Sequence, residues 1–309
     1  MNNIICIAGP TASGKTALAV ELAKELNGEV VSCDSMQVYR RMDIGTAKPT
    51  LEERQGIPHH MLDVAEPWED FSVSRYCVLA GPIVDDIVAR GKTAIIAGGT
   101  GLYMDSLIKG HDFAPFPSTG MREKLERQAD EAGMEAMRLL LRSIDPEAEA
   151  RIQDRKRLLR ALEVYYETGE TITEHDRKTR MIPPKYTPLW LGLDFEDRKT
   201  LYDRIDLRVS LMLEMGLVEE IRCLLDSGIP ATATAMQAIG YKEFVNALAG
   251  QGTVAEAADQ VRQSSRRYAK RQLTWFRRNP AMHWLTRGND ESFDEILQKA
   301  RQVLHESDN

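Results

Sequence analysis

Short apolar runs alternate with longer amphipathic stretches along this chain. Residues 4–8, 29–33, 93–97 and 189–195 have the length and composition of buried strands, and a further short strand is expected at residues 282–285. Helical periodicity separates the runs, as is typical of strands that lie parallel in one sheet. The pattern therefore predicts an α/β fold, a parallel sheet flanked by helices, with ligands at the carboxyl ends of the strands.

Two proline-rich stretches mark an insertion in this pattern. Residues 114–117 and 182–188 bracket a segment that is almost entirely helical by period, and the strand pattern resumes just beyond it. We therefore expect an α/β core begun by residues 1–113, an inserted all-helical domain at 114–184, and completion of the core by 185–309. Long helical stretches fill most of the last part, with breaks at Gly216, Gly228 and Gly250.

The composition is that of a globular protein without covalent crosslinks. The chain has 309 residues, of which 43% are hydrophobic, and its formal net charge is -7. Its four cysteines are far apart and form no C-x-x-C pair, so we expect reduced thiols, with neither a disulfide nor a zinc site. No apolar run has the length of a membrane span, and the first strand leaves no room for a signal peptide. A cytoplasmic monomer is expected.

A glycine-rich motif directly follows the first strand. Residues 9–16 have the pattern G-x-x-x-x-G-K-[ST] of a phosphate-binding P-loop. Its backbone N–H groups would point at phosphate oxygens, and the following helix, roughly residues 15–26, would direct its positive end at the same anion. A P-loop NTPase-like core is therefore predicted, in which Lys15 supplies a charge and Thr16 a hydroxyl ligand for Mg²⁺. The predicted phosphate contacts are Gly9, Pro10, Thr11, Ala12, Ser13, Gly14, Lys15 and Thr16.

The next two strands lead into residues that bear on the chemistry. The second leads to Asp34, which we predict to be a general base, with capping of a helix or turn as the alternative. The third runs into Gly-Gly-Thr-Gly at residues 98–101, where NTP-hydrolysing machines have an acidic ligand of Mg²⁺. A motor or switch function is therefore not expected. We interpret the glycines as room for a flat substrate that contacts Thr100, with a tight turn as the alternative.

Basic residues are concentrated in two segments of this acidic chain. In residues 262–278, seven Arg and Lys side chains share one half of a predicted helix without an intervening acid. Val261, Tyr268, Trp275 and Phe276 occupy the other half. The second basic segment, residues 151–160, lies in the insert. Basic surfaces on two lobes with a phosphate site between them predict a clamp for a folded polyanion such as RNA, and a solvated face without a partner is the alternative.

Several longer motifs are similar to one enzyme family. Besides the P-loop, they are Asp-Ser-Met-Gln-Val-Tyr-Arg at 34–40, Asp-Ile-Gly-Thr-Ala-Lys-Pro at 43–49, Ala-Gly-Gly-Thr-Gly-Leu-Tyr at 97–103, and the segments 156–164, 236–242 and 270–277. Together they resemble tRNA dimethylallyltransferases of the bacterial type, since the cysteines of the eukaryotic zinc finger are missing. The resemblance runs nearly end to end. It implies transfer of a dimethylallyl group from dimethylallyl diphosphate to the exocyclic amine of adenosine at tRNA position 37, with Mg²⁺ and release of diphosphate.

The resemblance also implies roles for individual residues. Asp34, Lys15, Thr16, Thr100 and Arg208 form the implied catalytic set, in which Arg208 binds the diphosphate; a surface ion pair is the alternative for Arg208. The implied contacts with the anticodon stem-loop of tRNA are Asp34, Ser35, Met36, Gln37, Thr100, Arg122, Lys156, Arg157, Leu158, Leu159, Arg160, Met236, Gln237, Gly240, Tyr241, Lys242, Arg266, Lys270, Arg271, Gln272, Trp275, Arg277 and Arg278.

His59 and His60 are expected to make polar contacts in a loop and not to bind a metal, because adjacent side chains point in different directions.

Three other functions would use only part of these features. A small-molecule kinase would use the P-loop and Asp34 but not the basic helix, and an inactive RNA-binding module would leave the P-loop without a role. An enzyme that prenylates free adenine nucleotide would have no use for so much basic surface.

Overall fold

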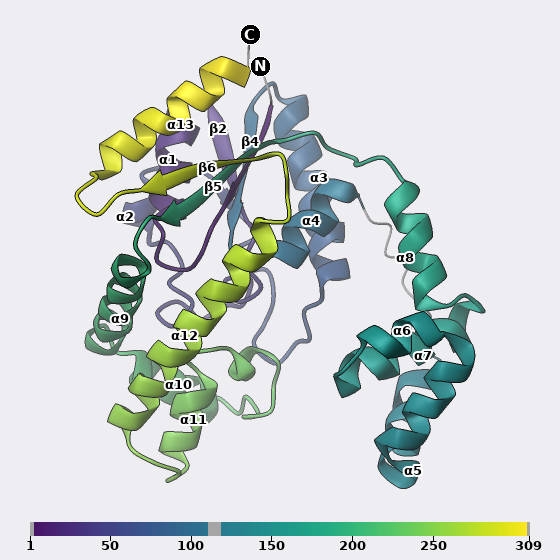
Figure 1. Ribbon diagram of the computed structural model, residues 1–309. Helices are drawn as coiled ribbons and strands as arrows, with labels where there is room; N and C mark the ends of the chain where they lie inside the picture. The colour runs from purple at the N-terminus through teal and green to yellow at the C-terminus, as the bar shows by residue number, and fades with distance from the viewer. Residues whose placement is uncertain (1–2, 111–118, 308–309) are drawn as a thin grey trace. The chain divides into compact units, whose positions relative to one another are not determined.

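The computed structural model describes residues 3–110 and 119–307 (Figure 1). Within these ranges six parallel strands form one sheet in the order β3-β2-β4-β1-β5-β6. The strands are β1 (Ile4–Ala8), β2 (Gly28–Ser32), β3 (His59–His60), β4 (Thr93–Gly98), β5 (Leu189–Phe195) and β6 (Met282–Arg287). The predicted parallel α/β fold is confirmed, and the short strand expected after residue 281 forms one edge of the sheet.

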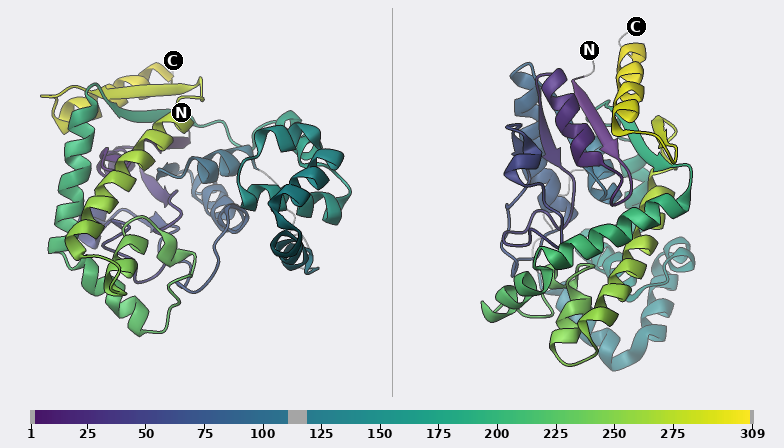
Figure 2. Two further views of the ribbon diagram at one scale, coloured as in Figure 1. Left: turned by 60° about the horizontal axis from the view of Figure 1, so that its bottom comes forward. Right: turned by 90° about the vertical axis from the view of Figure 1, so that its left-hand side faces the viewer.

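Helices cover both faces of the sheet (Figures 1 and 2). Successive side chains of a strand point to opposite faces, so Ile5 and Ile7 pack with α1 and α13 while Cys6 and Ala8 face the larger cluster that contains α3 and α4. The helices of this part are α1 (Lys15–Glu25), α2 (Leu51–Arg54), α3 (Val73–Ala89), α4 (Gly101–Lys109), α9 (Arg198–Glu214), α10 (Leu217–Asp226), α11 (Lys242–Leu248), α12 (Val254–Phe276) and α13 (Phe293–Ser307). A 3₁₀ turn spans Ala235–Gln237.

The chain divides into two compact units, one formed by Met1–Gly110 with Lys185–Asn309 and the other by His111–Pro184. The described part of the second unit consists of α5 (Met121–Ile144), α6 (Pro146–Arg151), α7 (Arg155–Thr168) and α8 (Ile172–Met181). Its own apolar cluster includes Leu125, Leu141 and Leu162. The predicted boundary after residue 113 and the proline-rich stretch 114–117 lie outside the described residues.

Buried Glu29 connects β2 to Arg90 and Lys92, which lie between α3 and β4, and to His60 of β3. Its carboxylate accepts hydrogen bonds from Arg90 and from Lys92, and His60 Nε2 lies 2.8 Å from Glu29 Oε2. The prediction that His59 and His60 lie in a loop is wrong, because they pair with β2 as the edge strand β3. A two-residue run carries no strand signal of its own, so only the neighbouring strand defines it.

Replacing Glu29 with Gln is expected to reduce the free energy of unfolding at pH 7 by about 3 kcal/mol, the low end for a broken buried ion pair. The Arg90 hydrogen bonds hold the pKa of the carboxyl well below its ordinary value of 4.5. A depressed native pKa adds stability that is present at neutral pH and is lost as the pH falls through and below that ordinary value. Urea unfolding at several pH values should therefore show the deficit shrinking in acid, whereas a deficit independent of pH would contradict this account.

Candidate active site

The P-loop connects the end of β1 to the start of α1. Gly9 has φ 154°, and a Cβ there would meet the Leu193 carbonyl oxygen at 2.9 Å, whereas Gly14 has φ 94° and precedes the first residue of α1. Both positions therefore require glycine. The Ser13 hydroxyl is buried and has no hydrogen-bond partner among the described residues. The loop thus presents a polar side chain and the amino end of a helix, as an anion site does.

Two cations and one carboxylate lie together beside this loop. Burial, followed by the charge of Arg208 on α9, lowers the pKa of Lys15 from 10.5 to about 7, and Asp34 opposes the shift. Burial also lowers the pKa of Arg208, again opposed by Asp34. Lys15 Nζ donates a 2.6 Å hydrogen bond to the Pro10 carbonyl. Lys15, Arg208 and Asp34 are therefore close enough to interact electrostatically, and the two basic groups are suited to bind an anion.

Asp34 begins a tight turn beyond β2. Its Oδ1 accepts hydrogen bonds from the backbone N–H groups of Met36 (2.8 Å) and Gln37 (3.3 Å). The Thr100 hydroxyl accepts the Ser35 N–H at 3.1 Å, which joins this turn to the end of β4. The alternative reading of Asp34 as a capping residue therefore holds for Oδ1. No donor to Oδ2 occurs within the part of the chain that the structure describes, so this oxygen is available to accept a proton.

Gln272 of α12 braces the loops on either side of the site. Its Oε1 accepts the Thr11 N–H at 2.9 Å and its Nε2 donates to the Gly99 carbonyl at 2.9 Å. The side chain is buried, so the prediction that Gln272 faces tRNA is wrong. A Cβ on Gly99 would lie 2.0 Å from Gln272 Nε2, and one on Gly101 would lie 2.2 Å from the Trp275 ring. The glycines thus make room for α12 and not for a flat substrate.

Two further side chains lie at the site although the sequence did not predict them there. Arg204 donates a 2.9 Å hydrogen bond from Nε to the Ala12 carbonyl, one helical turn before Arg208. Burial, followed by the charge of Asp34, raises the pKa of Tyr268 to about 12, and interactions with Thr100 oppose the rise. Tyr268 was assigned to the packing face of its helix. The only signal in the sequence was helical spacing, since Arg204 and Tyr268 each precede a predicted site residue by four positions.

The predicted basic face of α12 is partly occupied by ion pairs. Arg266 Nη1 lies 2.7 Å from Asp206 Oδ2, and Arg277 Nη2 lies 2.7 Å from an oxygen of buried Asp194. The Arg278 guanidinium stacks over the Trp275 ring, whose Nε1 donates to Asp105. The acids come from other elements and were invisible in the helical pattern. Three cations of the face, Arg267, Lys270 and Arg271, are exposed and have no carboxylate partner in the described ranges.

Several residues predicted to face tRNA are packed inside the protein. Leu158 and Leu159 belong to the apolar cluster of the insert. Met236 and Tyr241 belong to the main cluster, and Gly240 is buried beside them. These predictions are wrong as direct side-chain contacts, because the resemblance covers continuous segments that also contain the buried residues anchoring them. Ser35, Met36 and Gln37 are half-buried, whereas Gln237 and Lys242 are exposed.

The basic segment of the insert also carries intramolecular pairs. Arg122 pairs with Glu126 at 2.8 Å, Arg157 with Asp154 at 3.2 Å and Arg160 with Glu163 at 2.9 Å. Asp154 also caps α7 by accepting the Arg157 N–H. Lys156 is exposed. These side chains lie on the surface of the second unit, where ion pairs are weak enough to exchange for phosphate contacts.

The residues beside the P-loop could supply only part of the coordination shell of Mg²⁺. Thr16 offers a hydroxyl in the first turn of α1. No three His, Cys, Asp or Glu side chains gather as a metal group in residues 3–110 or 119–307. Mg²⁺ prefers oxygen ligands and keeps several waters, and phosphate oxygens complete such sites. The residues present are therefore compatible with Mg²⁺ that arrives with a phosphorylated substrate.

Comparison with known sequences gives consistent matches over the whole chain. Residues 37–279 match the family described as IPP transferase, and residues 2–67 match isopentenyl transferase. The tRNA dimethylallyltransferase of Acetivibrio thermocellus is 44% identical over 307 residues, which cover 98% of each chain. That of Thermoanaerobacter sp. is 47% identical over 297 residues, covering 95% of this chain and 94% of the relative.

Solved structures agree with these matches. The tRNA isopentenylpyrophosphate transferase of Bacillus halodurans is 41% identical, with a TM-score of 0.75 over 99% of this chain and 96% of the other. A eukaryotic dimethylallyltransferase acting on tRNA is 30% identical, with a TM-score of 0.85 over 97% of this chain and 78% of the other. Sequence identity at this level over nearly the full length shows common descent as well as a common fold. The chain therefore belongs to the tRNA dimethylallyltransferase family.

Proposed function

We propose that this enzyme transfers a dimethylallyl group from dimethylallyl diphosphate to the exocyclic amine of adenosine at tRNA position 37. The observation that carries the proposal is the convergence of Lys15 and Arg208 on the P-loop with Asp34 beside them. Two desolvated cations stabilise an anion, and a single carboxylate at the same place provides a proton acceptor. The diphosphate leaving group would thus face the cations Lys15 and Arg208, and the adenine amine would face the carboxylate of Asp34.

The reaction follows from these charges. The adenine nitrogen forms a bond to the allylic carbon while the carbon–oxygen bond to diphosphate breaks, and diphosphate leaves with the electron pair. Lys15, Arg208 and the P-loop N–H groups stabilise the negative charge that grows on the leaving oxygens. The adenine amine is a weak nucleophile because its lone pair is delocalised, so removal of its proton by Asp34 assists bond formation, typically by 10²–10⁴-fold.

Mg²⁺ is proposed as the cofactor, with Thr16 as its protein ligand. When bound, it would neutralise charge on the diphosphate. Removal of Mg²⁺ is therefore expected to weaken binding of the donor.

Among the described residues, none of the helices combines the length and the apolar composition that a membrane span needs.

One assay tests the proposed function. The protein is mixed with dimethylallyl diphosphate, Mg²⁺ and an anticodon stem-loop RNA, and the RNA is analysed by mass. We expect one added five-carbon unit, located on the adenosine at position 37. No product with RNA, together with turnover of ATP on a small alcohol, would favour a kinase. Prenylation of free adenine nucleotide at the same rate would favour the nucleotide-directed enzyme.

The exposed cations of α12 are expected to bind RNA phosphates. Replacing Arg267, Lys270 and Arg271 with Ala should weaken the binding of different tRNAs by similar factors. The slope of log K against log salt concentration should become shallower by at most about three, one for each lost phosphate contact. Binding measured between low and moderate salt tests this. Arg277→Ala is the matched control, because its pairing with Asp194 predicts lost stability more than a changed slope. A slope unchanged in the triple variant would mean that this face is merely solvated.

A further inference from the structure

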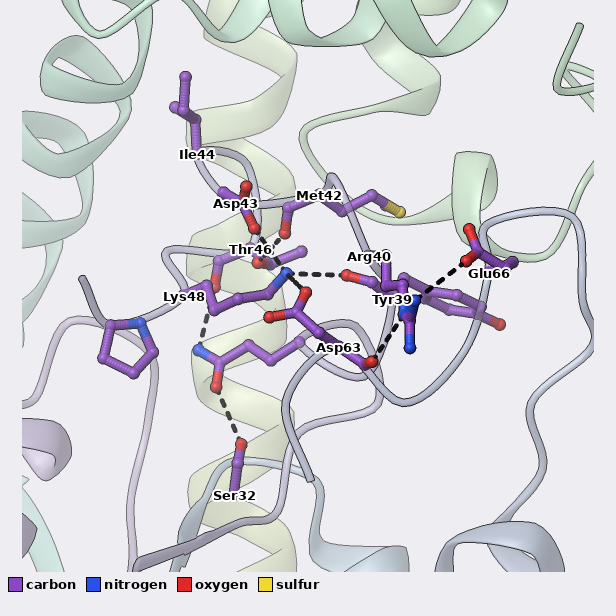
Figure 3. Close-up of polar contacts among 12 residues, drawn as sticks. Ser32, Tyr39, Arg40, Met42, Asp43, Ile44, Thr46, Lys48, Asp63 and Glu66 are labelled. Atoms are coloured by element: carbon purple, nitrogen blue, oxygen red, sulfur yellow. Dashed lines mark hydrogen bonds and ion pairs between the residues drawn. The ribbon is translucent and has the colours of Figure 1, made fainter. Parts of the chain in front are cut away.

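A buried lysine lies at the centre of the loop that follows the Asp34 turn (Figure 3). The Lys48 side chain is only 3% exposed. Its ammonium donates to the Tyr39 carbonyl at 2.8 Å and contacts Asp43 Oδ1 and Asp63 Oδ1 at 2.6 Å each. An ammonium has three donors, and all three are used here. Lys48 therefore cannot reach an RNA phosphate in this conformation.

The loop held by Lys48 in turn holds Gln37. The Gln37 amide nitrogen donates to the carbonyls of Thr46 (3.3 Å) and Ala47 (3.1 Å), and its oxygen accepts the Ser32 hydroxyl at 2.9 Å. Both amide donors are thus directed at the protein. Gln37 was predicted to contact tRNA, yet in the structure it braces the turn, and its backbone N–H caps Asp34.

The backbone near Lys48 is strained, so the polar contacts around it must hold the loop in this conformation. Ala47 and Asp63 both have positive φ, 45° and 56°, although neither is glycine. Such a backbone persists only where the surroundings determine it. Glu220 of α10 supplies a second anchor: its carboxylate accepts the N–H groups of Asp43 and Ile44 at 2.8 Å each. The loop is therefore fixed from two sides.

We propose that Lys48 is a positioning residue that orients the Asp34 turn toward the acceptor adenosine, through the loop carbonyls and Gln37. The inference rests on the proposed function, in which Asp34 takes the proton of the adenine amine. Lys48 itself touches neither reacting atom. The path runs from Lys48 to residues 46–47, then to the Gln37 amide, and from the Gln37 N–H to the Asp34 carboxylate. A small displacement of the turn would move the base relative to the amine, which costs rate more than binding.

A double-mutant cycle with Lys48→Met and Gln37→Leu tests the proposal. We expect Lys48→Met to lower kcat with the anticodon stem-loop at least about tenfold while the Kd of dimethylallyl diphosphate stays within about twofold. If Lys48 acts through Gln37, the double variant should be no more than about threefold slower than the slower single variant. Lys48→Arg should recover part of the rate. Additive losses, an unchanged kcat, or donor binding that weakens as much as kcat would overturn the proposal.

Controls separate positioning from general destabilisation. Lys92→Met removes another ion-paired lysine, remote from the turn, and should lower the unfolding temperature without lowering kcat. If Lys48→Met does not fold, Asp63→Asn removes one of its partners and should show the same selective loss of kcat on a smaller scale; normal kinetics in Asp63→Asn would then overturn the proposal. Failure of the proposed function would appear differently, as a wild-type protein that forms no prenylated RNA.

Discussion

Replacing Asp34 with Asn is expected to lower kcat for prenyl transfer at least about a hundredfold, the low end for a lost general base. The amide cannot accept the proton of the adenine amine. It retains an oxygen that can accept the Met36 and Gln37 N–H groups, so the turn should persist. Affinity for tRNA should therefore stay near that of the wild type.

Single-turnover rates and a separate binding measurement distinguish these effects. The matched control is Asp86→Asn, which changes an exposed carboxylate that pairs with Arg90 at 2.8 Å. A variant Asp34→Asn with near-normal turnover would remove Asp34 from the mechanism. Loss of tRNA affinity in proportion to rate would instead mean that the carboxylate serves only to hold the turn.

The second large effect is expected from Arg208→Met, which should slow transfer by about 10²–10³-fold, as for loss of one group that stabilises charge in the transition state. Met keeps much of the length and the apolar stem of Arg, and Arg208 is half-buried on α9. The remaining cation, Lys15, would face the leaving diphosphate without its neighbour. Donor binding should weaken as well, because ground state and transition state both carry the negative charge.

Steady-state kinetics with varied dimethylallyl diphosphate test this expectation. Arg222→Met is the control, since Arg222 is exposed on α10 and pairs weakly with Glu219 at 4.0 Å. Equal kcat and KM in Arg208→Met and the wild type would show that Arg208 does not contact the diphosphate. The alternative of a surface ion pair would then regain support.

Patterns confined to a few consecutive residues predicted the fold well. The apolar runs 4–8, 93–97 and 189–195 correspond to β1, β4 and β5 within one residue, because burial on both faces of a parallel sheet requires continuous apolar runs. The P-loop was equally clear, since its glycines are required by the backbone itself. The edge strand β3 and helix α2 were missed because each is too short to carry a periodic pattern.

The site was predicted in part. Asp34, Lys15 and Arg208 are close enough to interact electrostatically, and their catalytic roles stay predictions. The resemblance implied that Gln272 faces tRNA, whereas its side chain is buried between two loops. Lys48 was treated only as part of a motif, although it has three polar partners in the fold.

Local sequence was thus enough to specify the parallel sheet, the phosphate-binding loop and the family, because each depends on neighbouring residues in a fixed spacing. The roles of individual polar side chains depended on long-range packing. Gln272 meets the Gly99 carbonyl across 173 positions of sequence, and Arg277 meets Asp194 across 83. Whether a cation faces solvent or a buried carboxylate is determined by such distant partners, and no spacing within one helix encodes them.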